Sequence, residues 1–254
     1  MVETTIGAAS DAGDAFRIGA VFSRAGAIFS RRFPQFVALT AIAWLPQSVL
    51  TYIGRSSPDF AANGVVKTVL IALGSILLWG VLTIFSHAIV IQGAFRDMRG
   101  SSFGIGESLA AALARFLPLL GMGVILILGL LLGAVLLVFP ALMLTAGWYV
   151  AAPVCVVERQ GPVESLRRSA ALTKGHRWKI FGISMVLAIV GGIILKVLTL
   201  ILGATLGLLA ETLGTLVWQA LYGAFSAIVV VVLYHDLRVA KEGVDVERIA
   251  AVFD

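Results

Sequence analysis

The chain has 254 residues, of which 59% are hydrophobic and only 13% are charged, and its mean hydropathy is +1.01. Ordinary soluble domains carry about 25% charged residues, so this composition excludes a typical water-soluble domain and indicates apolar helices in a lipid bilayer. The formal net charge is +5. We expect the basic residues to meet anionic lipid headgroups rather than nucleic acid.

The first 32 residues are predicted to form a cytoplasmic tail that ends in an amphipathic helix. Arg17, Arg24 and Arg31 recur every seven residues, which is close to two helical turns, so these side chains share one face. Arg32 adds a further charge at the end of this segment. A basic face opposite an apolar one is typical of a helix that lies in the membrane interface.

Six apolar segments follow and predict six transmembrane helices. They lie at 33–53, 68–95, 116–138, 142–157, 178–197 and 213–234. The third and fourth come from a stretch of 42 residues, 116–157, that has no charged side chain. One spanning helix needs only ~20 residues, so we expect two helices joined by a turn at Phe139-Pro140.

The apolar segment 197–212 is too short to span the membrane separately. It either extends the fifth helix or lies along the outer interface, and the sequence leaves both arrangements open. Lys196 and Glu211 flank this segment. We expect Lys196 to extend its ammonium group toward the interface, where Glu211 is an available partner.

Charged residues mark the ends of alternate predicted helices. Helices two, four and six end near an acid and an arginine, in the pairs Arg96 with Asp97, Glu158 with Arg159, and Asp236 with Arg238, the last following Tyr234. In this arrangement nearly all basic residues fall on one side of the membrane, which places both termini in the cytoplasm. Asp97 and Asp236 could serve as general acids, but solvated pairing with the adjoining arginine is the simpler interpretation.

The predicted fold is therefore an all-α, polytopic membrane helix bundle. About six transmembrane helices form three hairpins, and basic amphipathic helices at the cytoplasmic interface precede them. We divide the chain into a tail and interfacial helix (1–32), a six-span membrane domain (33–238) and a short cytoplasmic tail (239–254). The expected location is a bacterial cytoplasmic membrane.

One cytoplasmic connection is especially basic. Its cationic residues are Arg167, Arg168, Lys174, Arg177 and Lys179. These side chains could bind phospholipid headgroups through charge-assisted contacts, and they could also set the orientation of the chain in the membrane. Both roles are compatible with the same positions.

His87 is the most deeply placed ionisable residue in the predicted helices, about nine residues before Arg96. A neutral imidazole that hydrogen-bonds across helices is the simpler interpretation, and a substrate contact or a proton site is the functional one. The three histidines are isolated in sequence and show no metal-ligand spacing. We therefore expect no bound metal, no cofactor and no catalytic residues.

The ending 233–245, together with 153–179, resembles the six-span membrane domain of the glycerophosphoryl diester phosphodiesterase membrane-domain family. In fused members of that family the hydrolytic chemistry belongs to a separate soluble barrel domain, for which this chain has no room. The resemblance implies a stand-alone bacterial membrane domain without hydrolase activity.

The leading functional hypothesis is a non-enzymatic membrane protein that handles lipids or organises the membrane. A small transporter or flippase with a pathway between hairpins is the first alternative, and an intramembrane lipid enzyme is the second. Two GxxxG spacings, Gly129 with Gly133 and Gly203 with Gly207, could pack helices within the chain or in a homodimer. A different membrane protein is also a possible partner.

Overall fold

The computed structural model describes residues 18–57, 65–98, 113–136 and 138–242, together with the single positions 106 and 110. Every element within these ranges is a helix, as predicted for the fold class. The helices are α2 (Ile18–Arg31), α3 (Phe33–Ser56), α4 (Val65–Met98), α6 (Phe116–Leu136), α7 (Val138–Gly147), α8 (Ala151–Val157), α9 (Pro162–Leu172) and α10 (Arg177–Glu242). Arg17 and residues 243–254 of the predicted tail (239–254) lie outside the described residues, whereas residues 239–242 belong to α10.

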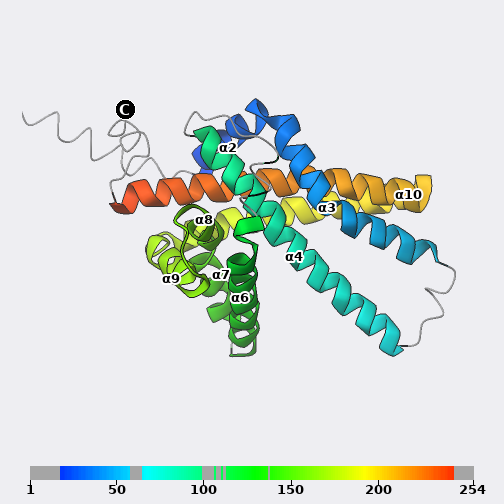
Figure 1. The fold of residues 1–254 in the computed structure, drawn as a ribbon, viewed down its shortest axis with the longest axis horizontal. Helices are drawn as coiled ribbons and strands as arrows, with labels where there is room; N and C mark the ends of the chain where they lie inside the picture. Colours follow the sequence, from blue (N-terminus) through cyan, green and yellow to red (C-terminus); the bar gives the residue numbers. More distant parts are fainter. Residues whose placement is uncertain are drawn as a thin grey trace, which may run out of the picture.

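The long helix α10 is a hairpin whose two arms fold back on each other at Gly207. Gly207 has φ of 82° and ψ of −176°, a conformation that residues with a side chain rarely adopt. The Tyr222 hydroxyl donates a hydrogen bond to the Leu187 carbonyl oxygen at 3.2 Å, across 35 residues of sequence. The two arms, coloured yellow and orange to red, run side by side in Figure 1.

This hairpin answers a question that the sequence left open. The segment 197–212 continues the first arm of α10 (177–206), turns at Gly207 and begins the second arm (208–242). The turn defines one end of the molecule, which we call the Gly207 end. The opposite end, where the second arm finishes, is called the Tyr234 end.

The helices pack most closely around the second arm of α10. Gly223 allows this approach, because a Cβ atom added there would lie 3.2 Å from Thr40 Cγ2 of α3 and 3.9 Å from Ser86 Oγ of α4. The buried core continues toward the Tyr234 end through residues such as Ile228 and Leu233. In contrast, apolar side chains on other parts of these helices stay exposed, including Leu77 at 68%.

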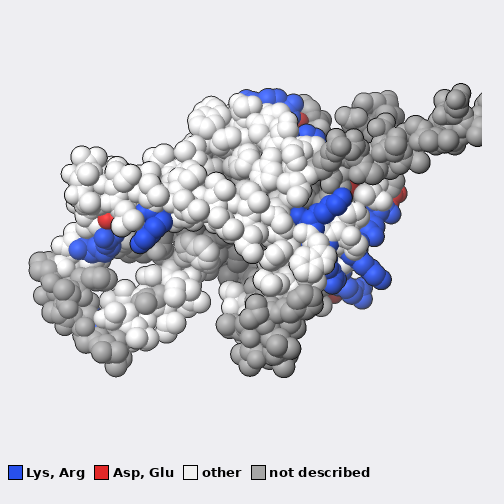
Figure 2. Space-filling model, turned by 180° about the vertical axis from the view of Figure 1, so that it is seen from behind, with Lys and Arg blue, Asp and Glu red and all other residues white. Residues whose placement is uncertain are grey.

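The described residues contain several helices that are long and apolar enough to cross a membrane. Three stretches meet this description, Phe33–Ser56, Lys67–Met98 and the α10 hairpin Arg177–Glu242, and shorter apolar stretches occupy Phe116–Gly129 and Leu142–Val157. Figure 2 shows Lys and Arg side chains toward opposite ends of one face, with an uncharged stretch between them. Exposed apolar surface bounded by charge is expected of a protein that lies in a bilayer.

Two predicted features of the segment 116–157 differ in the structure. Helix α6 ends at Leu136 and α7 begins at Val138, so the chain turns just before Phe139-Pro140 and both of these residues belong to α7. The predicted fourth helix, 142–157, is not continuous but is broken between α7 and α8. Pro153 explains this break, because its ring has no N–H and would clash with the carbonyl group four residues earlier.

Candidate functional site at the Tyr234 end

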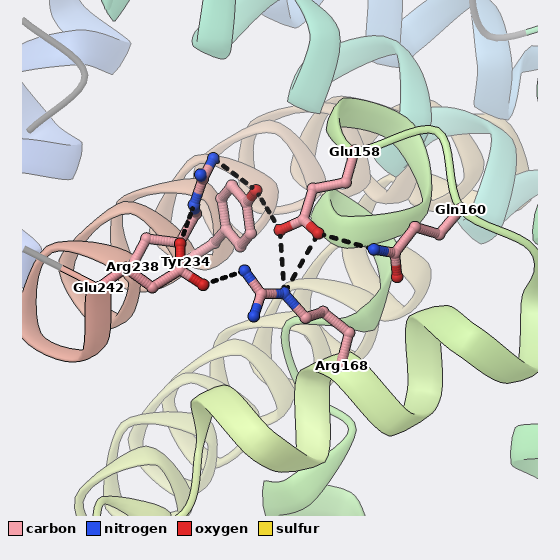
Figure 3. Close-up of polar contacts among 6 residues, drawn as sticks. All are labelled: Glu158, Gln160, Arg168, Tyr234, Arg238 and Glu242. Carbon is pink, nitrogen blue, oxygen red and sulfur yellow. Dashed lines mark hydrogen bonds and ion pairs between the residues drawn. The ribbon is translucent and has the colours of Figure 1, made fainter. Parts of the chain in front are cut away.

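Charged side chains from several helices meet at the Tyr234 end. Helix α9 lies beside α8 here, and both approach the last turns of α10 (Figure 1). Figure 3 shows six residues from these elements pointing toward one another, namely Glu158, Gln160, Arg168, Tyr234, Arg238 and Glu242. Hydrogen bonds join five of them, Glu158, Tyr234, Arg238, Glu242 and Arg168, into a closed ring, and Gln160 is bound to this ring through Glu158.

Glu158 follows the last residue of α8 and forms one side of this ring. Its Oε1 atom accepts a hydrogen bond from the Tyr234 hydroxyl at 2.9 Å. Its Oε2 atom accepts hydrogen bonds from Arg168 Nε at 3.2 Å and from Gln160 Nε2 at 3.0 Å. The carboxylate thereby connects the end of α8 to both α9 and α10.

Glu242 forms the other side of the ring, one turn after Arg238 on α10. Arg238 Nε donates to Glu242 Oε2 at 3.1 Å, and Arg168 Nη2 donates to Glu242 Oε1. Arg238 Nη1 also donates to the Tyr234 hydroxyl at 3.3 Å, which closes the ring. Two arginines and two carboxylates balance, so the network carries no net charge.

The pKa values of the ring favour its charged form. Burial alone would raise the pKa of Glu242, but hydrogen bonds from Arg168 and Arg238 lower it below its usual value. Burial likewise opposes the charge of Arg168, yet its bond to Glu242 and the charges of Glu158 and Glu242 raise the Arg168 pKa overall. Near neutral pH these groups keep their charges, so the ring holds helices together rather than exchanging protons.

A second connection joins α2 to the end of α10. Arg24 Nη1 lies 2.7 Å from Asp236 Oδ1, and Arg24 Nη2 donates to Asp236 Oδ2, so the pair is bidentate. The Asp236 side chain is only 4% exposed. His235 Nδ1 lies 3.6 Å from the same carboxylate and would add to the pair only when protonated. Asp236 therefore pairs with α2, whereas its expected partner Arg238 belongs to the ring.

Asp97 repeats this arrangement at the end of α4. Arg32 Nε lies 2.8 Å from Asp97 Oδ1, and Arg31 Nη2 lies 3.2 Å from Asp97 Oδ2. The expected partner was Arg96, which adjoins Asp97 in the sequence. The structure instead links Asp97 to the junction between α2 and α3, so both candidate general acids are held by arginines from the first 32 residues.

Helix α2 has a basic face, and its apolar face packs on the bundle. Val21, Ala25 and Ile28 are buried. Phe22 and Phe29 lie against Phe225 of α10, with ring centroids 6.3 Å and 5.9 Å away. The predicted amphipathic helix is therefore present, and its apolar face contacts protein.

The basic connection around α9 divides into two groups. Arg168 belongs to the ring, and Arg177 packs beside Gly147. Arg167, Lys174 and Lys179 are exposed, as is the neighbouring Arg159. This difference separates the residues that hold the helices together from those that can meet a ligand at the surface.

Helix α9 is itself fixed to the break between α7 and α8. The Ser169 and Thr173 hydroxyls donate to the Gly147 carbonyl oxygen at 2.8 Å and 3.1 Å. This oxygen belongs to the last residue of α7, whose intrahelical partner is missing because the helix ends there. The exposed cations on and beside α9 therefore lie at a helix that these buried hydrogen bonds hold in place.

His87 is half-buried in α4, and the described residues supply no hydrogen bond to its imidazole ring. His87 lines neither the cavity between α3 and the two arms of α10 nor the apolar cavity beside Phe225. Within the described residues, no group of three or more His, Cys, Asp or Glu side chains could hold a metal ion. Among the described residues, the charged side chains that mark the predicted helix ends meet at the Tyr234 end and not around His87.

Sequence reasoning missed Glu242, which completes the ring, and Gln160, which binds to it through Glu158. The four-residue spacing between Arg238 and Glu242 on a helix was a usable signal for one of these contacts. The expected pairing of Lys196 with Glu211 is also replaced, because Glu211 binds Arg55 at 2.6 Å.

No family model, curated protein or solved structure matches the chain. The resemblance to the glycerophosphoryl diester phosphodiesterase membrane-domain family therefore stays a prediction.

Proposed function

We propose that this chain is a non-catalytic integral protein of a bacterial cytoplasmic membrane that binds anionic phospholipid headgroups at its Tyr234 end. One observation carries the proposal. The buried and half-buried carboxylates at this end are held by arginines, while Arg167 and Lys174 are exposed on and beside α9. The carboxylates are thus already paired while cations are exposed at the surface, and exposed cations can bind phosphate groups.

The proposed topology has six spans and both termini in the cytoplasm. Helices α3, α4 and α6, the broken pair α7–α8 and the two arms of α10 would be the spans, arranged as three hairpins. The reversal at Gly207 and the break between α6 and α7 support this arrangement. The concentration of basic residues at the Tyr234 end supports a cytoplasmic position for that end.

A binding role is favoured over catalysis by the state of the four buried or half-buried carboxylates described at this end. Asp97, Glu158, Asp236 and Glu242 each interact with at least one arginine. A general acid or base needs a proton that it can exchange at the working pH. Carboxylates neutralised by arginine are suited to holding the helices in place around a binding surface.

The proposal is tested by measuring which lipids the purified chain retains from vesicles that contain equal amounts of phosphatidylglycerol and phosphatidylcholine. We expect the parent chain to enrich phosphatidylglycerol, as counted by native mass spectrometry. The double variant Arg167→Gln/Lys174→Gln should reduce this enrichment about tenfold or more, because each basic side chain near an anionic surface contributes about 1 kcal/mol. Lys67→Gln, an exposed change at the start of α4, is the control.

Equal enrichment in the parent chain and in the double variant would contradict the proposal. Loss of enrichment in the Lys67→Gln control would also contradict it, because the effect would then follow total charge rather than the α9 surface.

A small transporter or flippase is the second candidate, and one observation favours it. A cavity to which many residues with polar side chains contribute lies between α3 and the two arms of α10, near the Gly207 end. Transporters place polar sites between their helices. Movement of a fluorescent phospholipid between the leaflets of reconstituted vesicles, faster with the chain than without it, would support this candidate.

A further inference from the structure

The cavity at the Gly207 end has a volume of about 370 Å³ and lies between α3 and the two arms of α10. Ten of its twelve lining residues have polar or charged side chains, which is unusual for helices whose other surfaces are so apolar. Its volume falls within the range of ~300–1,000 Å³ that is typical of small-molecule sites. Polar groups at membrane depth are costly unless they bind water, one another or a ligand.

An ion pair forms one wall of the cavity. Arg55 Nη1 of α3 donates to Glu211 Oε1 of the second α10 arm at 2.6 Å. Glu211 lies over Gly203, because a Cβ atom added to Gly203 would be 2.8 Å from Glu211 Oε2. The Glu211 side chain is 15% exposed and the Arg55 side chain is 46% exposed, so the guanidinium is accessible beside the cavity.

Two further lining residues have unused binding capacity. Gln47 Oε1 is buried and accepts no hydrogen bond. The exposed Lys196 forms no ion pair with any described residue, and it lines the cavity together with Arg55 and Glu211. These three charged groups give the cavity a net charge of +1. The lining therefore offers two cations for an anion and one buried acceptor that lacks a donor.

We propose that this cavity binds a phosphate group, and that its natural source is the headgroup of a membrane phospholipid. Lys196 and the outward guanidinium N–H groups of Arg55 bind the phosphate oxygens through charge-assisted hydrogen bonds. A hydroxyl or ammonium donor of the headgroup satisfies Gln47, and Glu211 keeps Arg55 oriented. The inference rests on the proposed position of the chain in a membrane, but not on lipid binding at the Tyr234 end.

The test uses the full chain in detergent and three water-soluble probes. These are dihexanoyl phosphatidylethanolamine, dihexanoylglycerol, which has the same chains without the phosphate, and inorganic phosphate. Binding is measured by isothermal titration calorimetry. We expect the phosphate-bearing lipid to bind at least about tenfold more tightly than dihexanoylglycerol, because hydrogen bonds to charged groups contribute that much or more.

Two variants locate the binding on the cavity. Lys196→Gln should weaken binding of the phosphate-bearing lipid about tenfold, because it removes one charge-assisted contact while keeping a side chain of similar length. Lys67→Gln is the matched control, since Lys67 is also an exposed lysine but does not line the cavity. It should bind like the parent chain.

Each outcome has a defined meaning. If inorganic phosphate competes fully with the lipid at similar affinity, the phosphate site is supported and its source is a soluble phosphate. If dihexanoylglycerol binds as tightly as the phosphate-bearing lipid, or if Lys196→Gln and Lys67→Gln bind alike, the inference is overturned. Arg167→Gln/Lys174→Gln should leave this binding unchanged, so failure here is distinct from failure at the Tyr234 end.

Discussion

Arg24 and Asp236 lie 212 residues apart in the sequence, and the Arg24 guanidinium binds the Asp236 carboxylate through both of its oxygens. This pair fastens the first described helix to the last turns of α10. Asp97 is bound in the same way by Arg31 and Arg32. The amino-terminal segment therefore helps to hold the bundle together at the Tyr234 end.

Arg24→Gln should destabilise the chain, because it leaves the Asp236 charge buried without its main partner. We expect a loss of about 2 kcal/mol, less than the 3–5 kcal/mol typical of fully buried pairs, since the Arg24 side chain is 45% exposed. The measurement is thermal unfolding in detergent, followed by tryptophan fluorescence. Arg31→Gln is the control on the same helix, because Asp97 keeps Arg32. Equal unfolding temperatures for both variants would rule out this role of Arg24.

The ring around Glu158 and Glu242 should make stability depend on acidity. The pKa of Glu242 is lowered from 4.5 in the folded chain. The unfolded chain consequently binds this proton more readily than the folded chain does. The contribution is present above pH 4.5 and is lost as the pH falls through the lower folded pKa. Unfolding temperatures measured between pH 3 and pH 7 should decline at the acid end.

The variant Glu242→Gln isolates the contribution of this residue to the acid response. It removes the titrating group, so its unfolding temperature should change less between pH 5 and pH 3 than that of the parent chain. An identical acid response in both chains would assign the effect to other carboxylates.

Tyr234→Phe should also weaken the ring, because one hydroxyl donates to Glu158 and accepts from Arg238. The expected loss is about 1–2 kcal/mol, the usual cost of deleting a partly buried hydrogen-bonding group that has charged partners. Thermal unfolding of the full chain measures it. Tyr52→Phe is the matched control, because Tyr52 is exposed in α3. A similar effect from both changes would argue against a special role for the ring.

Two adjacent glycines provide a test of the α10 hairpin. A Cβ atom added to Gly191 would lie 2.4 Å from the Tyr222 ring, whereas one added to Gly192 would meet no atom within 4 Å. Gly191→Ala should therefore push the arms apart and cost about 1–3 kcal/mol, as overpacking usually does. Gly192→Ala should be neutral or slightly stabilising, because alanine favours helices. Thermal unfolding of both variants measures the difference, and equal stabilities would contradict the packing of the two arms.

The turn of the same hairpin requires glycine because of its backbone conformation, and not because a side chain would lack room. Gly207 has a φ of 82° and nothing within 4 Å of an added Cβ atom. Gly207→Ala should destabilise the chain by about 1–2 kcal/mol through backbone strain alone. Gly182→Ala, at another glycine with open space, is the control. The unfolding temperatures of the two variants in detergent are compared. Equal unfolding temperatures for Gly207→Ala and Gly182→Ala would argue against the turn at Gly207.

Hydropathy and arginine spacing were enough to predict an all-α membrane chain and the helix that became α2. Both are local properties, because a helix forms from residues three or four positions apart. The partner of Arg24 could not be predicted in this way, since Arg238 is nearer to Asp236 in the sequence and equally charged. Only the packing of α2 across α10 selects the distant pair.

The break between α7 and α8 was predictable in part, because Pro153 removes a backbone hydrogen bond and disfavours a continuous helix, although α3 runs through Pro46 without a break. A count of apolar residues treats proline as compatible with a span and so overlooked it. The cavity at the Gly207 end was harder to foresee. Its polar residues are spread over α3 and both arms of α10, and only the reversal at Gly207 brings Arg55 and Glu211 together.

The bonds from Ser169 and Thr173 to the Gly147 carbonyl oxygen make two neighbouring parts of the chain depend on each other. Without α9, that buried oxygen would lose both of its hydrogen bonds, at a cost of about 1–3 kcal/mol. During synthesis, the end of α7 therefore gains these donors only after the residues of α9 have been made. A chain cut after Gln160 would leave the Gly147 carbonyl oxygen without them.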